Sequence, residues 1–510
     1  MESRTYNSKR NITFGIICSL ALPASGFLVK TAIIRCFSIE YLGLTSVLAS
    51  ILQVLNMAEL GFSSAIVVNL YEPIKQNNVI GIRSILRYYR SIYRIIGAII
   101  LVLGLLFLPF YPNFLGEKNN LNVDIYVIYI IYLANTVISY FLFAYKEAML
   151  NAVQRFDITK RVFLFTSLLR DICQLIALVV LRNFYLFSII LLISTVIYSV
   201  IIQLVSKKKY KEYYPDGIIE KETRKNIKEQ IAGLSIGKVL EVSRNSFDTL
   251  IISAFLGLTI VGQYNNYYYV YSVLINIAWV VINAIQSSVG NSIVSETKEK
   301  NFSDLLKMES LYSIGLSIGT ACLLTMYQPF MSLWMGNEML FDNSIMILFV
   351  IYFYVMGING VRNAYFFALG LWWKAKWLLI SEAASNLLLN ILLGKLFGVY
   401  GVLFATIITI VLLNYFGITR LLFQEYFKSG FTRFIKNRLI STMITVLACI
   451  SSYLICSMIT ISGFLNIVCR GAITCIISTG IVVGFLYYFW NEQFVLANSF
   501  FKNILTTRRK

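Results

Sequence analysis

The chain alternates long apolar runs with short polar segments along its whole length. A bilayer core of roughly 30 Å needs about 20 apolar residues per helix, and on this measure the apolar runs predict fourteen membrane-spanning helices. Two pairs of spans are joined by so few residues that we expect tight helical hairpins. The predicted ranges are about 12–34, 43–70, 88–111, 123–145, 163–181 and 184–205 (a hairpin), 231–255, 262–293, 309–334, 341–369, 377–394 and 399–419 (a hairpin), 439–459 and 464–488.

Positive charges gather on alternate loops of this pattern. These loops and the two termini hold 34 of the 44 Lys and Arg residues, whereas the opposite loops hold three, which are Lys118, Arg182 and Lys395. The positive-inside rule places the basic loops in the cytoplasm. We therefore expect both termini to be cytoplasmic, and the formal net charge of +19 follows from topology without a nucleic-acid partner.

The chain also repeats itself weakly. One predicted helix opens with Glu40-Tyr41-Leu42-Gly43 and another, about 220 residues later, with Ile260-Val261-Gly262-Gln263; each runs to a Ser-Ser pair and then a Glu before a basic loop. Six helices separate the copies, so they share one orientation, as in parallel-repeat transporters. We expect two parallel six-helix lobes with two helices outside them. The expected boundaries are 1–205 for the first lobe, 206–230 for a cytoplasmic linker, 231–424 for the second lobe, and 425–510 for the last two helices and a basic tail.

Seven basic residues fall within or directly at the end of the predicted spans, apart from Arg90 and Arg94 at the start of span 88–111, which are counted with the basic loop before it. A charge at bilayer depth costs roughly 2.5–3.5 kcal/mol, so such residues usually face a bundle interior or a watery cavity. Arg35 lies at the end of a span and is expected to reach the interface, Arg170 has Asp171 as a partner, and Arg470 lies outside both lobes. The remaining four are Lys30, Lys238, Arg244 and Arg362.

The predicted span 231–255 carries a polar stripe. At 100° per residue, Lys238, Glu241, Arg244, Asn245 and Asp248 occupy one face about 120° wide. These residues are close enough to pair with one another along the helix, so the stripe is either a dry packing seam or the wall of a cavity. The predicted spans hold seven bases and five acids; the acids are Glu59, Asp171, Glu241, Asp248 and Glu382. The resulting excess of positive charge would complement a diphosphate.

Amides and tyrosines line other predicted spans. Span 262–293 aligns Asn276, Asn283 and Gln286 behind a tyrosine-rich entrance (Tyr264, Tyr267, Tyr268, Tyr269 and Tyr271), and span 341–369 places Asn359 beside Arg362. Such side chains bind sugar hydroxyls and cover the apolar faces of sugar rings. The tyrosines are more typical of an interfacial aromatic belt. Glycine pairs at 233 and 237 and at 315 and 319 have the GxxxG spacing that indicates close helix packing.

Several kinds of chemistry are excluded by composition. The chain has no histidine and no CxxC pair, so we expect no metal site and no cofactor. It has no GxxxxGK[ST] motif and therefore does not hydrolyse ATP. No predicted loop can house a folded catalytic domain, and we predict that the protein is not an enzyme.

Four segments in the first part of the chain have a distinctive sequence: RCFSIEYLGL (35–44), LQVLNMAELGFSSAI (52–66), LYEPI (70–74) and YYRSIYRIIG (88–97). These segments resemble the polysaccharide biosynthesis family, which comprises the Wzx-type flippases of capsule, exopolysaccharide and O-antigen repeat units. This family belongs to the multidrug/oligosaccharidyl-lipid/polysaccharide exporter superfamily. The local similarity is clearest over residues 12–97, and the layout of spans extends it to the whole chain.

The resemblance implies a multi-pass transporter of the bacterial cytoplasmic membrane. Its substrate would be an undecaprenyl-diphosphate-linked oligosaccharide, moved outward by alternating access, with a polysaccharide polymerase as a candidate partner. On this hypothesis Lys30, Arg244 and Arg362 hold the diphosphate. Glu59 or Asp248 couples transport to a proton or sodium ion, and the cavity is lined by Lys238, Glu241, Asn245, Asn276, Asn283, Gln286 and Asn359. The alternative is a cation-coupled multidrug or small-molecule antiporter of the same fold.

Overall fold

The computed structural model describes residues 4–59, 62–115, 121–142, 144–459 and 461–489. Within these ranges, the side chains of residues 4–16, 19–20, 58, 63–64, 229–230, 232–241, 243–245, 284, 287, 486 and 488–489 are outside the description. Every described element is a helix, and the chain divides into two compact units, Met1–Asn265 and Asn266–Lys510. The expected boundaries of lobes and linker stay predictions beside this division.

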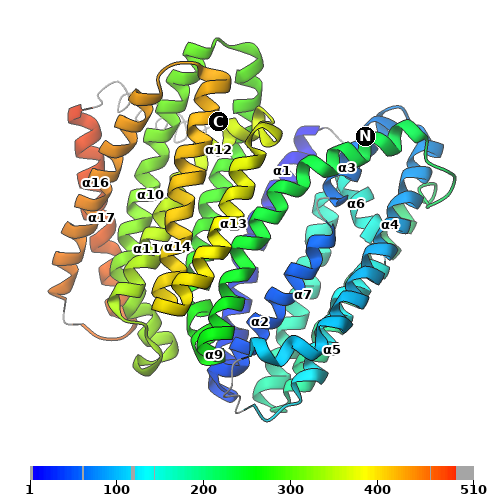
Figure 1. Cartoon of the computed structure of the whole chain (residues 1–510), viewed down its shortest axis with the longest axis horizontal. Helices are drawn as coiled ribbons and strands as arrows, with labels where there is room; N and C mark the ends of the chain where they lie inside the picture. The colour runs from blue at the N-terminus through cyan, green and yellow to red at the C-terminus, as the bar shows by residue number, and fades with distance from the viewer. Residues whose placement is uncertain (1–3, 60–61, 116–120, 143, 460, 490–510) are drawn as a thin grey trace. The chain divides into compact units, whose positions relative to one another are not determined.

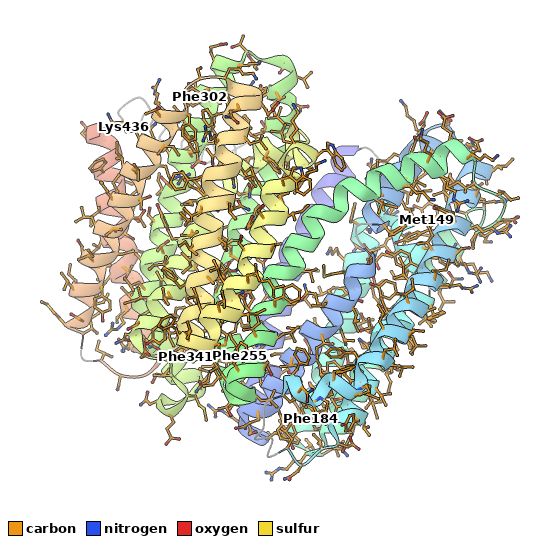
Figure 2. All side chains as sticks on the ribbon, viewed as in Figure 1. Met149, Phe184, Phe255, Phe302, Phe341 and Lys436 are labelled. Atoms are coloured by element: carbon orange, nitrogen blue, oxygen red, sulfur yellow. The ribbon has the colours of Figure 1, made fainter. Side chains whose placement is uncertain are left out.

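Unit 1 contains the first helices of the chain. These are α1 (Arg4–Cys36), α2 (Ile39–Leu55), the 3₁₀ helix η1 (Asn56–Glu59), α3 (Phe62–Lys75), α4 (Val79–Phe107), η2 (Leu108–Phe114), α5 (Ile125–Phe141), α6 (Ala144–Ala152), α7 (Phe156–Val179), α8 (Phe184–Lys209) and the first part of α9 (Lys221–Ser295). Helix α1 packs against α7, α7 against α8, and α5 against both α4 and α8 (Figure 1). At one end Phe184, labelled in Figure 2, packs edge-on against Tyr41 with ring centroids 4.8 Å apart.

Unit 2 is organised around one long helix, α10. It comprises the end of α9, α10 (Lys298–Met335), η3 (Asn337–Met339), α11 (Asn343–Gly357), α12 (Gly360–Ala368), α13 (Trp372–Phe397), α14 (Val399–Thr409), the π-helix η4 (Ile410–Ile418), α15 (Thr419–Leu422), the π-helix η5 (Phe423–Phe427), α16 (Phe431–Ser457) and α17 (Phe464–Phe489). The last two helices pack against each other and against α10 (Figure 1). Both predicted hairpins are present, as α7–α8 and as α13–α14, which turns at Gly398.

All fourteen predicted ranges overlap helices, but the helices that could cross a membrane do not correspond one to one with the predicted spans. In the described part, ten helices are long and apolar enough to cross a membrane, or eleven if the bent pair α5–α6 is one span. One of the ten covers 50 residues of α9, from Ser246 to Ser295. At 1.5 Å per residue this is about 75 Å, more than twice the bilayer core. It includes the predicted span 262–293 and the end of 231–255, with a non-helical break at Gly257 between them. The count of fourteen, like the cytoplasmic location of the termini, stays a prediction.

The two copies of the repeat begin at equivalent residues that contact each other. The chain leaves helical geometry at Ser38 before the first copy and at Gly257 before the second, where φ is 81°. A Cβ on Gly43 would lie 2.1 Å from the backbone oxygen of Leu258, and a Cβ on Gly262 would lie 2.5 Å from that of Ile39. These two contacts are reciprocal, because Ile39 precedes Gly43 by four residues just as Leu258 precedes Gly262. Glycine is therefore required at both positions for the helices to approach this closely.

The copies differ in how they continue. The first is interrupted, since α2 ends at Leu55, η1 occupies residues 56–59, and α3 begins at Phe62. The second is helical from residue 258 to Ser295. The prediction of a single span over 43–70 is corrected here to two helices with a short 3₁₀ helix between them.

The close packing predicted for Gly315 is wrong. A Cβ on Gly315 would meet nothing within 4 Å, and one on Gly319 would lie in ordinary contact with the Phe353 ring, at 3.5 Å. The same prediction for residues 233 and 237 concerns positions whose side-chain environment is outside the description. Spacing alone did not identify the glycines that allow close approach.

Candidate functional site

A partly open pocket of about 260 Å³ lies within unit 1. It combines two carboxylates with four phenols and several smaller polar groups, and its lining includes no Lys or Arg. The lining residues are Glu59, Tyr89, Tyr93, Ser139, Tyr140, Ala144, Glu147, Ala148, Asn151, Thr195, Tyr198, Ser199 and Ile202. We call this the tyrosine pocket.

Glu59, which the sequence marks as a candidate for ion coupling, is held in this pocket by two phenols. The Tyr93 hydroxyl donates a short hydrogen bond to one carboxylate oxygen, and the Tyr140 hydroxyl lies 3.0 Å from the other. Tyr140 also lies 3.2 Å from Oδ1 of Asn56. The Tyr93 ring packs edge-on against Tyr89, with centroids 4.3 Å apart, so the phenols are fixed by packing as well as by bonding.

A second carboxylate, Glu147, faces the same pocket from α6. It accepts a hydrogen bond from the Tyr198 hydroxyl on α8 and lies near enough to Glu59 for the two charges to interact. Because Glu147 lies at the end of an apolar run, the sequence pattern places it at a loop. The bend of 51° between α5 and α6 turns it toward the pocket instead.

Two interrupted helices therefore meet at the tyrosine pocket. One interruption is η1, which carries Glu59, and the other is the α5–α6 bend beside Ala144. Irregular backbone at membrane depth is tolerated where it is buried in protein or lines a cavity. Broken helices build the binding sites of many transporters for this reason. The pocket offers oxygen atoms and phenol donors, which suit a proton, a small cation or a hydroxyl-rich group.

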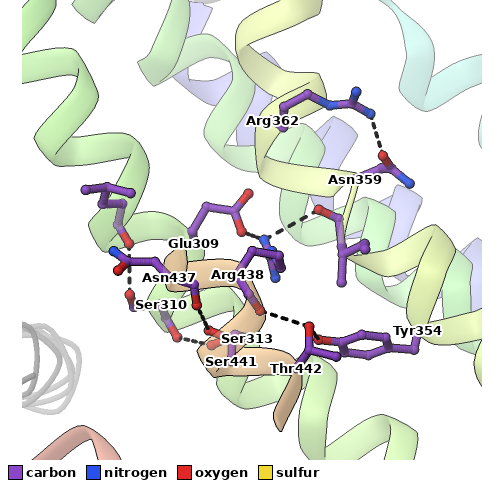
Figure 3. A network of polar contacts seen from close by, with 12 residues as sticks. Glu309, Ser310, Ser313, Tyr354, Asn359, Arg362, Asn437, Arg438, Ser441 and Thr442 are labelled. Carbon is purple, nitrogen blue, oxygen red and sulfur yellow. Dashed lines mark hydrogen bonds and ion pairs between the residues drawn. The ribbon is translucent and has the colours of Figure 1, made fainter. Parts of the chain in front are cut away.

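In unit 2 the predicted diphosphate ligand Arg362 has no exposed surface. Its guanidinium donates to Oδ1 of Asn359 at 2.5 Å (Figure 3), and to the backbone oxygen and Oδ1 of Asn414 at 2.7 and 2.8 Å. Nδ2 of Asn414 donates in turn to Glu382 at 2.9 Å. Asn414 lies in the π-helix η4, and such irregular turns occur frequently at functional sites. Arg362 thus occupies a buried polar network, and its role as a substrate ligand stays a prediction.

A buried ion pair joins Glu309 on α10 to Arg438 on α16 (Figure 3). Both residues are less than a tenth exposed. Close by, the Tyr354 hydroxyl donates to Oγ1 of Thr442 at 2.8 Å (Figure 3). The sequence pattern missed this pair, because Glu309 opens an apolar run and Arg438 ends a basic loop, where both are expected to be exposed.

The remaining candidates are dispersed. Lys30 is half-buried on α1, and Asp248 is buried on α9 and accepts from the Tyr264 hydroxyl at 3.3 Å. On the second part of α9, Asn276 and Asn283 are exposed and Gln286 is half-buried. The other four side chains of the polar stripe are outside the description, although the backbone there is helical; they are Lys238, Glu241, Arg244 and Asn245.

The other intramembrane bases have defined environments. Arg170 forms an ion pair with Asp171 at 2.8 Å, as the sequence predicts. Arg35 is exposed at the end of α1, where interfacial placement is expected. Nε of Arg470 donates to Oδ1 of Asn466 at 2.7 Å.

The tyrosine-rich entrance of span 262–293 separates into two groups. Tyr264, Tyr267 and Tyr271 are buried, whereas Tyr268 and Tyr269 are half-buried. The Tyr267 hydroxyl donates to Oε1 of Gln328 at 2.7 Å, and Tyr271 stacks on Tyr352 with ring centroids 4.5 Å apart. The buried tyrosines therefore belong to the cores of their units, which neither sugar binding nor an aromatic belt anticipates.

Comparison with known proteins gives the fold. No family model matches the sequence, and no curated protein matches it. Among solved structures, the inward closed conformation of the lipid II flippase MurJ is 17% identical and covers 93% of this chain and 100% of its own, with a TM-score of 0.67. The inward-facing conformation of a multidrug resistance MATE family transporter of the MOP superfamily is 13% identical, covers 84% of this chain and 98% of its own, and has a TM-score of 0.62.

A third similar structure is the Vibrio cholerae MATE transporter VcmN in its bent form, at 15% identity, with 83% of this chain and 98% of its own covered and a TM-score of 0.56. At such identities the likeness shows the fold alone. The chain has the fold that these flippase and MATE structures share. The two MATE structures are matched almost completely, yet they leave part of this chain without a counterpart.

Proposed function

We propose that this protein is a flippase that moves an undecaprenyl-diphosphate-linked oligosaccharide across the bacterial cytoplasmic membrane, for assembly of a surface polysaccharide. The observation that carries the proposal is the extent of the fold match. A lipid II flippase matches 93% of this chain, against 84% and 83% for the two MATE structures. The protein acts as a transporter and not as an enzyme, with a polysaccharide polymerase as a candidate partner.

The diphosphate is assigned to intramembrane bases. Lys30 on α1 and Arg244 on α9 carry the charge that it needs, with Lys238, Glu241 and Asn245 beside Arg244. Arg362 contributes when Asn414 releases its guanidinium. Because that guanidinium is already bonded in this conformation, its contribution belongs to another conformation of the transport cycle.

The sugar and the coupling ion are assigned to other polar groups. Asn276 and Asn283, exposed on α9, meet the glycan together with Gln286, and Asn359 supports Arg362. Glu59 binds the coupling ion or proton in the tyrosine pocket, where phenols hold its carboxylate. Asp248 is the second candidate for coupling.

The test uses the full-length chain reconstituted in proteoliposomes with a fluorescent polyprenyl-diphosphate oligosaccharide. Transfer between leaflets is read from quenching by a membrane-impermeant reductant. We expect Arg244→Ala and Lys30→Ala each to slow transfer about tenfold or more at equal protein levels, since one charge-assisted phosphate contact is worth roughly 1.5–3 kcal/mol. The control is Arg182→Ala, which removes an exposed loop charge.

Two results would reject this proposal. Transfer at the empty-liposome rate means that the chain does not move this lipid. If Arg244→Ala and Arg362→Ala both transfer lipid at the wild-type rate, these arginines do not form a cationic substrate site. Thiol labelling adds a structural check, because Cys placed at positions 241 and 245 reacts with a water-soluble reagent only if the stripe borders a watery cavity.

The second candidate function is a cation-coupled antiporter of multidrug or small-molecule type. Here the favouring observation is the tyrosine pocket, whose two carboxylates face no cationic side chain in the lining. A cation-driven efflux assay in the same liposomes separates the two. The antiporter is supported if the wild type exports organic cations, Glu59→Gln abolishes this export, and no lipid is transferred.

A further inference from the structure

A second pocket, of about 790 Å³, lies in unit 2 where η5 leads into α16. The side chains of Arg420, Lys428 and Arg433 line it together with Gln424, and its lining includes no carboxylate. All three bases are exposed. We call this the basic pocket; it is separate from every residue assigned above to transport.

The carboxylate next to the basic pocket in the chain, Glu425, offsets its charge only in part, since Glu425 interacts with Lys428 but is bonded to a base outside the lining. Glu425 forms an ion pair with Lys374, outside the lining. Nζ of Lys428 donates to the backbone oxygen of Gln424 at 2.5 Å, which leaves its charge without a counter-ion in that bond. Helix α16 adds to the imbalance, because its first turn has no acidic residue and Gly430 gives it no side-chain cap. The site therefore has an excess of positive charge that favours an anion.

The other wall of the basic pocket is apolar. Leu412 and Phe416 belong to the apolar span Val399–Phe427 and are 56% and 41% exposed. Arg420 follows Phe416 by one turn and Leu412 by two turns on the same helical segment. Cationic groups and exposed apolar side chains are thus adjacent at the end of a membrane span, on the side that the basic loops predict to be cytoplasmic. A soluble phosphate would contact only the basic residues, whereas a phospholipid would contact the basic residues with its headgroup and the apolar wall with its acyl chain.

We propose that the basic pocket binds an anionic phospholipid. Arg420, Lys428 and Arg433 hold the phosphate of its headgroup, and Leu412 and Phe416 contact its acyl chain. Anionic lipids are attracted to basic residues near the membrane surface by about 1 kcal/mol per base, which is roughly fivefold in affinity. This proposal does not rest on the proposed transport function.

The experiment is native mass spectrometry of the full-length chain with dioleoyl phosphatidylglycerol, and with dioleoyl phosphatidylcholine as the neutral lipid. We expect the wild type to bind phosphatidylglycerol at least tenfold more tightly. The combined variant R420Q/K428Q/R433Q should weaken this binding about a hundredfold. The matched control K207Q/K208Q/K209Q removes three exposed charges from the end of α8, outside the pocket, and should bind as the wild type does.

Two further arms identify the source of the phosphate. Inorganic phosphate at millimolar concentration should not displace the lipid. Phe416→Ser should lower the affinity for phosphatidylglycerol and should not raise the affinity for phosphatidylcholine. Full displacement by phosphate would overturn the lipid assignment. Equal affinity of the combined variant and the control would overturn the site. If the combined variant does not fold, the three single variants replace it, each with an expected loss of about fivefold.

Discussion

The two copies of the repeat start alike and then differ. In the first copy the helix stops at Leu55 and a 3₁₀ turn carries Glu59 into a pocket of phenols. In the second copy the helix continues to Ser295 and leaves Asn276 and Asn283 exposed on its surface. The same beginning thus leads to a polar pocket in one copy and to an unbroken helix with two exposed amides in the other. The two helices share a common start, and the local break in the first copy gives them different chemistry.

Buried carboxylates follow the same division. Glu59 in unit 1 is bonded by neutral phenols and opens onto a pocket. Glu309 in unit 2, on the helix after the second copy, is closed off by Arg438. A carboxylate held by phenols can exchange a proton or bind a cation, whereas one neutralised by Arg mainly fixes the packing. The predictions below test this difference.

The largest expected effect is on the closed carboxylate. Arg438→Ala should lower the free energy of unfolding by about 3–5 kcal/mol, because it leaves Glu309 buried without a counter-charge. The double variant E309L/R438M should recover most of that loss, since an apolar pair needs no charge compensation. Thermal unfolding in detergent measures both. Wild-type stability of Arg438→Ala would mean that the pair is not closed from water.

The common start of the two copies should be the next most sensitive feature. Gly43→Ala and Gly262→Ala should each cost about 1–3 kcal/mol, because the added Cβ meets backbone that cannot move aside. Gly290→Ala is the matched control on α9, where a Cβ meets nothing within 4 Å, and should be neutral or slightly stabilising. The same thermal assay compares them. Equal behaviour of all three variants would contradict the reciprocal contact.

The open carboxylate should matter more for transport than for stability. Glu59→Gln keeps one acceptor oxygen for Tyr93 or Tyr140, and its amide can donate to the other hydroxyl, so stability should change by about 1 kcal/mol or less. Ion-dependent transport should fall about tenfold or more, since the neutral amide cannot bind a proton. Initial rates at graded ion gradients provide the measurement. Glu72→Gln serves as the control, because Glu72 is exposed. A transport defect of equal size in this control would contradict a specific role of Glu59 in the tyrosine pocket.

The smallest effect concerns the second copy. Asn283→Ala should change stability by about 0.5 kcal/mol or less, as is usual for exposed positions. Asn301→Ala should cost about 1–3 kcal/mol, because buried Asn301 bonds Ser292 and the backbone at the end of α9. If Asn283 meets substrate, its variant should slow transport several-fold with no loss of folded protein. Fluorescence-detected size exclusion checks the latter.

The sequence predicted features that depend on local pattern. The apolar runs predicted the helices, and the short connections between spans predicted the hairpins α7–α8 and α13–α14. The adjacent pair Arg170 and Asp171 was also predictable, since both partners lie on one turn of a helix. The interval of 256–261 predicted between two spans contains the non-helical residue Gly257, although the sequence did not single out that residue.

Features that join distant residues were not predictable from pattern. Glu309 and Arg438 are 129 residues apart, and nothing near either of them marks a partner. The interruption at residues 56–59 was missed because these residues lie inside the range 43–70, which was predicted as one continuous span. Glu147 entered the tyrosine pocket only through the α5–α6 bend. Such contacts arise from tertiary packing, which periodicity does not record.

The reciprocal contact at Gly43 and Gly262 also bears on the history of the chain. Residues equivalent in the two copies touch across it, and Oγ1 of Thr259 donates to its own counterpart, Glu40, at 2.9 Å. Two identical subunits related by a two-fold axis make contacts of this isologous kind. In a self-pairing ancestor of half the length, one substitution would have altered both sides at once. In a single chain the two sides mutate independently, which permits an unlike pair such as Glu40 and Thr259.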